Sequence, residues 1–135
     1  MQKSKKKKRG GRKLPVAYRG LTDAMFDLMI YTIEKIIRDV RTKHILRHPE
    51  DKRKTVLGLA TSDGIVWLSR SKRHVKKEPM VKTLIHEVLH HIYAGGVPHY
   101  HVYRMEKILW RRFTEEQKRF LRQYIPRHTV KSEPQ

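Results

Sequence analysis

The amino-acid sequence predicts a small α+β domain: an N-terminal helix, a β-hairpin or small antiparallel sheet, a histidine-bearing helix and two C-terminal helices. Three observations predict it. Apolar residues recur at helical spacing in several stretches, two short, mainly apolar runs flank an Asp-Gly turn, and the chain is long enough for only one core. We expect residues 22–125 to form this domain, with a basic tail at residues 1–21 and a polar tail at residues 126–135.

The first helix is expected to begin at Thr22, whose hydroxyl can cap it, and to run to about Arg47. The apolar residues of one face recur every three or four positions: Phe26, Met29, Ile30, Ile33, Ile37 and Val40. Two strands follow at residues 56–60 and 65–69, because segment 61–64 between them, Thr-Ser-Asp-Gly, contains a strong hairpin turn signal.

The remaining elements are predicted to be helices. One covers residues 79–94 and a second covers residues 102–113. The second helix is expected to bury Val102, Met105, Leu109 and Trp110. Residues 114–117, Thr-Glu-Glu-Gln, form a capping box for a further helix that ends before Pro126.

Residues 86–90, His-Glu-Val-Leu-His, place two histidines four positions apart on the helix 79–94. At about 100° per residue, His90 lies about 40° round the helix from His86, so both imidazoles leave one face and can hold one Zn²⁺. The apolar residues of this helix fall on the opposite side: Val81, Leu84, Ile85, Val88 and Ile92. Glu87 lies beside the histidines, where its carboxylate can accept a proton from zinc-bound water. This arrangement suits hydrolysis of an amide.

A catalytic zinc site usually has three protein ligands and one open position, so a third donor is needed. Residues 95–96, both glycine, are expected to end the helix, because glycine takes the left-handed conformation at a helix end. Pro98 prevents the helix from resuming at once, and the chain turns back toward the motif. This favours His99 as the third ligand, with His101 and Glu106 as the alternatives.

The segment 83–91, Thr-Leu-Ile-His-Glu-Val-Leu-His-His, followed by His-Tyr-His-Val-Tyr at 99–103, resembles the core of the SprT-like (Spartan-type) zinc metalloproteases. The resemblance extends over about residues 22–113 and implies a zincin-like fold. Carried over by position, the three zinc ligands and the general base are His86, His90, His99 and Glu87. The residue after the third histidine is often glycine in that family, whereas it is Tyr100 here. The resemblance also implies that a strand edge pairs with an extended peptide.

The chain carries 32 lysines and arginines against 13 acidic residues, a formal net charge of +19 over 135 residues. Such a balance indicates a polyanionic partner. We expect phosphate contacts from the N-terminal tail, which should be disordered in isolation, and from a basic run before the metal helix. The residues concerned are Lys3, Lys5, Lys6, Lys7, Lys8, Arg9, Arg12, Lys13, Arg70, Lys72, Arg73, Lys76 and Lys77. Further cations at 41–54 and 104–122 extend this charge, and no base-reading motif accompanies them.

Small size and a long basic tail resemble ribosomal proteins, so rRNA or a ribosomal subunit is preferred over DNA as the partner. Three hypotheses follow. The first is a nucleic-acid-associated zinc protease, for which the Spartan resemblance implies DNA–protein crosslinks as substrates. The second is a structural ribosomal or ribosome-associated protein that keeps the zincin fold and its metal without proteolysis. The third is a protease dedicated to one protein partner.

Other compositional features set limits on the protein class. Cysteine is absent, which excludes disulfides and thiolate zinc sites. Because no apolar run is long enough for a bilayer and no signal-peptide core follows the basic start, we expect no membrane partner and a cytoplasmic protein associated with ribosomes or the nucleoid. Asparagine is also absent and 33% of residues are charged, a composition typical of hyperthermophiles.

Overall fold

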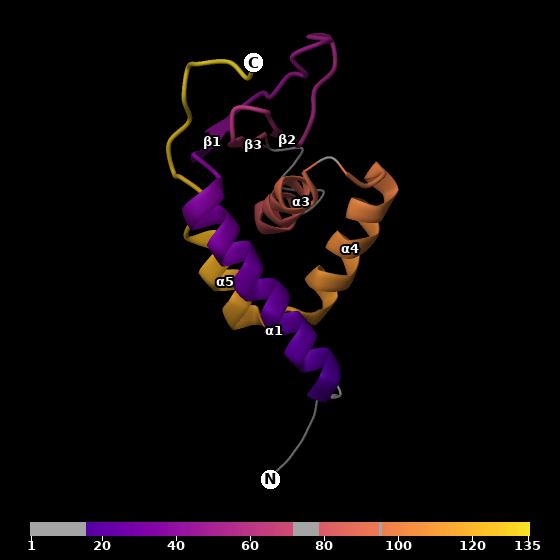
Figure 1. Cartoon of the computed structure of the whole chain (residues 1–135). Helices are drawn as coiled ribbons and strands as arrows, with labels where there is room; N and C mark the ends of the chain where they lie inside the picture. Colours follow the sequence, from indigo (N-terminus) through magenta and orange to yellow (C-terminus); the bar gives the residue numbers. More distant parts are fainter. Residues whose placement is uncertain (1–15, 72–78, 95) are drawn as a thin grey trace.

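One helix, α3 (Met80–Tyr93), lies between a small sheet and the other helices (Figure 1). The computed structural model describes residues 16–71, 79–94 and 96–135. The other helical elements are α1 (Val16–Tyr31), the π-helical turn η1 (Thr32–Ile36), α4 (His99–Arg112) and α5 (Glu115–Arg122). The strands are β1 (Asp39–Lys43), β2 (Gly58–Ala60) and β3 (Ile65–Ser69). The predicted α+β fold is therefore confirmed.

The sheet is mixed rather than antiparallel. Within the described residues the strand order is β1-β3-β2, with β2 antiparallel to β3 and β1 parallel to β3. The predicted hairpin is confirmed, although β2 is shorter than the expected range 56–60. Every residue of β3 is buried, because this central strand is covered on both faces. Val66 and Leu68 pack on the helical side, and Trp67 packs with Leu46 on the other side.

The first helix differs from its prediction at both ends. It begins at Val16, within the stretch assigned to the basic tail, and Thr22 lies inside it as a buried residue rather than as its cap. The expected continuation to Arg47 is wrong. Helical structure ends at Ile36, and residues 39–43 form β1 instead.

Local chemistry explains why the helix stops. The Thr32 hydroxyl donates to the backbone oxygen of Leu28 at 2.7 Å, and the Ile37 N–H donates to the Thr32 oxygen at 2.8 Å. The second bond spans five residues, so the last turn widens into a π-helix. Beyond it, Val40 and Thr42 alternate with charged residues, a period of two that favours a strand. Val40 nevertheless packs against the core, as the helical spacing had suggested.

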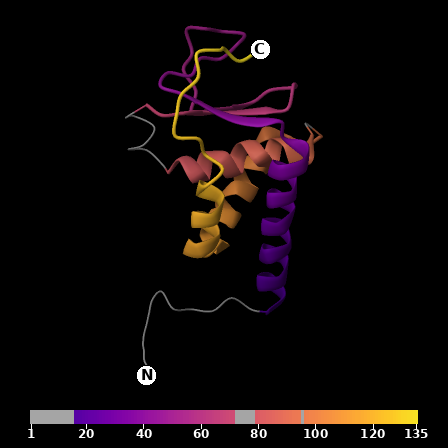
Figure 2. The ribbon, with the colours of Figure 1, turned by 90° about the vertical axis from the view of Figure 1, so that its left-hand side faces the viewer.

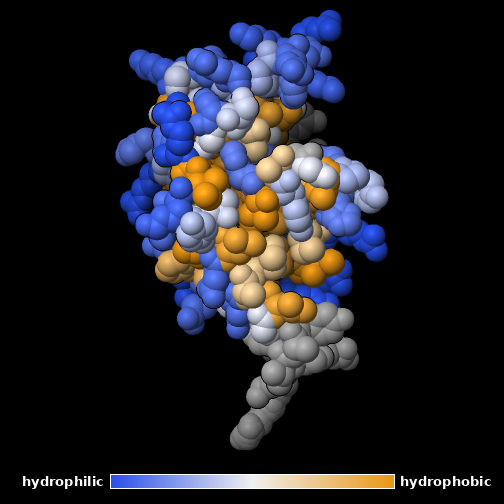
Figure 3. Space-filling view, in the orientation of Figure 1, coloured by the Kyte–Doolittle hydropathy of each residue, from blue (hydrophilic) through white to orange (hydrophobic). Residues whose placement is uncertain are grey.

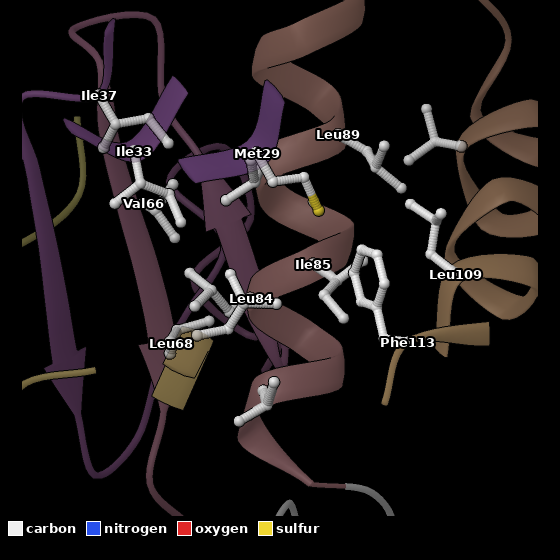
Figure 4. Packing of buried hydrophobic residues seen from close by; sticks show 14 residues of the cluster. Met29, Ile33, Ile37, Val66, Leu68, Leu84, Ile85, Leu89, Leu109 and Phe113 are labelled. Atoms are coloured by element: carbon white, nitrogen blue, oxygen red, sulfur yellow. The ribbon is translucent and has the colours of Figure 1, made fainter. Parts of the chain in front are cut away.

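The apolar stripe of α3 forms the centre of the core. Its fully buried members are Val81, Leu84, Ile85 and Val88, whereas Ile92 is only partly buried. Figure 4 shows Leu84 facing the strand residue Leu68, while Ile85 lies beside Phe113 on the opposite side of the helix. Each such side chain contributes about 1.5–3 kcal/mol when fully buried. The stripe predicted for this helix is therefore confirmed, and it fixes the orientation of the opposite, histidine-bearing face.

The two C-terminal helices are confirmed, although α4 begins at His99 rather than at the predicted residue 102. Of the apolar residues expected in α4, Val102 and Leu109 are buried, and Met105 and Trp110 are partly buried. The capping box before α5 is confirmed. Gln117 N donates to Thr114 Oγ1 at 3.0 Å and Thr114 N donates to Gln117 Oε1 at 3.0 Å. None of the helices in the described part of the chain combines the length and apolar character that crossing a membrane requires.

The C-terminal segment returns from α5 to the sheet (Figure 2). Thr129 forms a bridge with Thr42 of β1, and the Thr42 hydroxyl donates to His128 O at 3.0 Å. The Lys43 ammonium donates to the backbone oxygens of Lys131 at 3.3 Å and Ser132 at 3.0 Å. Residues 126–135, predicted as a polar tail, therefore cover the outer edge of β1.

Candidate metal centre

Three histidines from two helices converge at one end of α3. His86 and His90 lie one turn apart on that helix, and His99 is the first residue of α4. One ligand atom from each can be chosen so that all lie within 4.8 Å of one another, and the Nε2 atoms of His86 and His90 are 3.1 Å apart. In tetrahedral coordination, two nitrogens each about 2.0–2.1 Å from zinc are about 3.3 Å apart. The sequence-predicted trio is thus brought together.

The turn between the two helices places His99. Helix α3 ends at Tyr93, and Ala94 adopts the left-handed conformation with φ of 51°. The Gly96 N–H then donates to the Tyr93 oxygen at 2.9 Å. Pro98 is extended and precedes the first turn of α4, so the chain reverses within a few residues. The left-handed cap predicted for residues 95–96 is therefore carried by Ala94, and Gly95 lies outside the described residues.

The alternative third ligands occupy other positions. His101 is exposed and is not part of the histidine group found among the described residues. Glu106 is buried, 4% exposed, and its Oε1 accepts a hydrogen bond from His86 Nδ1 at 2.7 Å. Its other oxygen lies 3.8 Å from the Lys82 ammonium. Because Nδ1 of His86 is held by Glu106, Nε2 is the nitrogen left to face a metal.

Glu87 lies beside the histidines in the narrow space between α3 and β2. Its side chain is buried, and burial raises the pKa of its carboxyl to about 7, against the opposing influence of His86 and with a further rise from Glu106. A Cβ on Gly58 would lie 2.7 Å from Thr83 Cγ2 and 2.8 Å from Glu87 Oε2. Only glycine therefore lets β2 approach α3 this closely.

The donor set fits zinc. Three imidazoles with no cysteine in the chain make a nitrogen-only site, which suits zinc in a catalytic arrangement with a fourth position for water or substrate. Burial and the neighbouring His86, His99 and His91 lower the pKa of His90 to about 4, so that imidazole is neutral at pH 7. The neutral form is the one that binds metal ions.

A cleft of about 890 Å³ opens onto these residues. It is lined by the histidine trio, Glu87, Gly58, Ala60, Arg38 and His48, among others. In the β2–β3 ladder, Ser69 N donates to Leu57 O and Thr61 N donates to Ile65 O. Pairing alternates along an antiparallel strand, so the backbone N–H and C=O groups of Gly58 and Ala60 point away from β3. Within the described part of the chain these groups have no backbone partner, so the cleft borders an unpaired strand edge.

Most of the basic residues singled out by the sequence lie outside the described residues, namely those at positions 3–13 and 72–77. Arg70 is described, and its guanidinium is held inside the fold. It donates to Thr42 Oγ1 at 3.2 Å and to the backbone oxygen of Pro126. These two contacts connect β1, the end of β3 and the C-terminal segment.

Sequence reasoning did not identify Gly58 or the orienting role of Glu106. A glycine inside a predicted strand is a signal of close backbone approach, but it does not say which element comes close. Glu106 was recognised only as a possible ligand. Comparison with known proteins adds no further assignment: no family model, curated protein or solved structure matches this chain.

Proposed function

We propose that this chain is a zinc-dependent peptidase associated with nucleic acid, with rRNA preferred over DNA as the polyanion. The observation that carries the peptidase half is the histidine trio beside Glu87 in a cleft with a free strand edge. The net charge of +19 carries the nucleic-acid half, because dispersed cations without a base-reading motif match phosphates.

The roles of the residues follow from their positions. A zinc ion in the trio would supply Lewis acidity toward the scissile carbonyl and toward water. Glu87 would accept the proton of the attacking water and pass it to the amide nitrogen as the C–N bond breaks. The edge groups of Gly58 and Ala60 would hydrogen-bond an extended peptide, which places its backbone along the cleft. Glu106 would keep His86 oriented throughout.

Substitution of Glu87 tests this proposal. We expect the purified chain to bind about one zinc ion, and Glu87→Gln should keep that metal while abolishing hydrolysis of an unfolded protein substrate. Zinc content is measured by atomic emission and hydrolysis by gel and mass spectrometry. Glu116→Gln, which changes an exposed carboxyl on α5, serves as the matched control and should cleave normally. Equal hydrolysis by the Glu87 variant would reject the mechanism.

A second candidate is a ribosome-associated protein that keeps the metal without cutting anything. The specific observation in its favour is the burial of Glu87, which is only 6% exposed and lies against Gly58. Density-gradient fractionation of cell lysate separates the two candidates. Comigration with a ribosomal subunit, together with zinc binding and no hydrolysis, supports this one, whereas a hydrolytically active chain supports the peptidase. In either case, the affinity of the chain for nucleic acid should fall steeply as the salt concentration rises.

A further inference from the structure

The outward face of α4 carries a row of aromatic and cationic side chains. Counting about 100° per residue, they fall within an arc of about 100° on the side opposite the buried Val102 and Leu109. We call this row the α4 stripe, and its members are Tyr100, Tyr103, Arg104, Lys107 and Arg111. Figure 3 shows hydrophilic residues along the right-hand edge of the molecule, where Figure 1 places α4.

No carboxylate in the described part of the chain pairs with the cations of the stripe. Among residues 16–71, 79–94 and 96–135, no side chain forms an ion pair with Arg104, Lys107 or Arg111. The only carboxyl on α4 is that of Glu106, which is buried and contacts His86 and Lys82 rather than a cation of the stripe. As far as the described residues go, the stripe is therefore a face of uncompensated positive charge.

The tyrosines of the stripe are exposed as well. Tyr100 is 66% exposed and Tyr103 is 49% exposed, so much of each ring faces solvent. The Lys107 ammonium lies 4.7 Å from the centre of the Tyr103 ring, which shows that cations and rings are interleaved rather than separate. Cations alone would satisfy an acidic protein or a duplex backbone. Exposed flat rings beside them add a surface on which unpaired bases can stack.

We propose that the α4 stripe binds single-stranded nucleic acid. Bases stack on Tyr100 and Tyr103, and phosphates pair with Arg104, Lys107 and Arg111. A duplex hides the faces of its bases, so it can use only the cations. The proposal rests on the nucleic-acid association proposed above and adds the surface, the strand state and the mode of contact.

Substitution of Tyr100 in the full chain tests the stacking contact. Binding is measured by fluorescence anisotropy with labelled oligothymidylate, oligouridylate and a DNA duplex. Tyr100→Ala should weaken single-strand binding about tenfold and leave duplex binding almost unchanged, while Tyr100→Phe should bind like the parent. Tyr31→Ala removes a ring that is 57% exposed on α1 and should change nothing. The two single strands distinguish DNA from RNA.

The phosphate contacts are tested through salt dependence. Lys107→Gln should lower the slope of log affinity against log salt by about one, whereas Lys35→Gln, an exposed lysine in η1, should keep the parent slope. Polyglutamate serves as a competitor that offers charge without bases.

Several outcomes would overturn the proposal. A Tyr100→Ala chain that binds single strands as tightly as the Tyr31→Ala chain contradicts stacking, and so does an equal loss for single strand and duplex. Polyglutamate that competes as well as oligothymidylate would indicate an acidic protein instead. If every α4 variant binds like the parent with a steep salt dependence, the surface is wrong and the nucleic-acid association stands. If the parent binds no polynucleotide, both fail.

Discussion

Glu106 determines which nitrogen of His86 is available to a metal. The carboxylate accepts from Nδ1 at 2.7 Å and is itself only 4% exposed, so it is held between α3 and α4. Histidine ligands commonly donate their second ring nitrogen to a carboxylate in this way, which fixes the tautomer and makes the ligating nitrogen more basic. We therefore expect the negative charge of Glu106 to raise the metal affinity of the site, although Glu106 itself does not coordinate the metal.

Glu106→Gln should weaken zinc affinity about tenfold, because the amide oxygen can still accept from Nδ1 but the negative charge is gone. Competition with a chromophoric chelator measures the affinity, and circular dichroism checks that the fold is kept. Glu115→Gln removes a carboxyl from the exposed side of α5 and should leave zinc affinity unchanged. An unaltered affinity in the Glu106 variant would show that the carboxylate has no orienting role.

Counting residues was enough to predict that His86, His90 and His99 meet, because helix geometry fixes the first two and the short turn limits the third. It was not enough for Gly58. Glu87 is enclosed because β2 lies against α3, and nothing in residues 56–60 alone indicates that α3 is the element beside them. Contacts within one helix or across a short turn can therefore be predicted from sequence, whereas contacts between elements far apart in the chain cannot.

At the scale of elements, the end of α3 carries a conformational cost. Ala94 has a φ of 51°, in the left-handed region that costs a residue with a Cβ roughly 1–2 kcal/mol. Ala94 keeps this unfavourable conformation because the turn that it forms brings His99 back to α3. The prediction of a glycine-type helix stop was right in kind but assigned the position to residues 95–96.

Ala94→Gly should raise the free energy of unfolding by about 1 kcal/mol, because glycine adopts the left-handed conformation without the steric penalty. Urea denaturation followed by circular dichroism measures the change. Ala24→Gly, at an exposed position inside α1, is the control and should lower stability by roughly the same amount, as glycine does in a helix interior. Destabilisation by both substitutions would contradict the assigned cap.

The first helix shows why one element was predicted wrongly. Its apolar residues keep helical spacing as far as Val40, and the periodicity alone does not reveal the π turn at Ile36. Residues 39–43 become a strand because β3 offers a parallel partner, from Asp39 opposite Ile65 to Lys43 opposite Ser69. A parallel pairing between segments this far apart cannot be recognised from either segment alone.

At the scale of the whole molecule, contacts across about ninety positions of sequence connect η1 and β1 to the segment that follows α5. The Tyr124 hydroxyl donates to Glu34 Oε2 at 2.5 Å, and Lys43 binds the backbone of residues 131 and 132. These contacts attach the segment after α5 to η1 and β1. Burial, and then Glu34, raise the pKa of Tyr124 to about 12.

The Tyr124 contact should be visible at high pH. Because its pKa in the folded chain lies above the ordinary value of 10.0, the stabilising contribution is complete below pH 10 and is lost as pH rises through about 12. Phenolate absorbance should therefore show a tyrosine step near pH 12, and Glu34→Gln should move that step to lower pH. Glu50→Gln changes an exposed carboxyl elsewhere and should not. A late step that survives Glu34→Gln would assign it to another tyrosine.

His99 is the first residue of α4, so the third imidazole of the candidate metal centre and the α4 stripe lie on the same helix. Binding of zinc at the start of this helix and binding of an oligonucleotide along its exposed face must therefore obey thermodynamic linkage. Whatever factor zinc introduces into oligonucleotide affinity, the oligonucleotide must introduce into zinc affinity. Zinc titrations with and without the oligonucleotide, and oligonucleotide titrations with and without zinc, should therefore give the same factor.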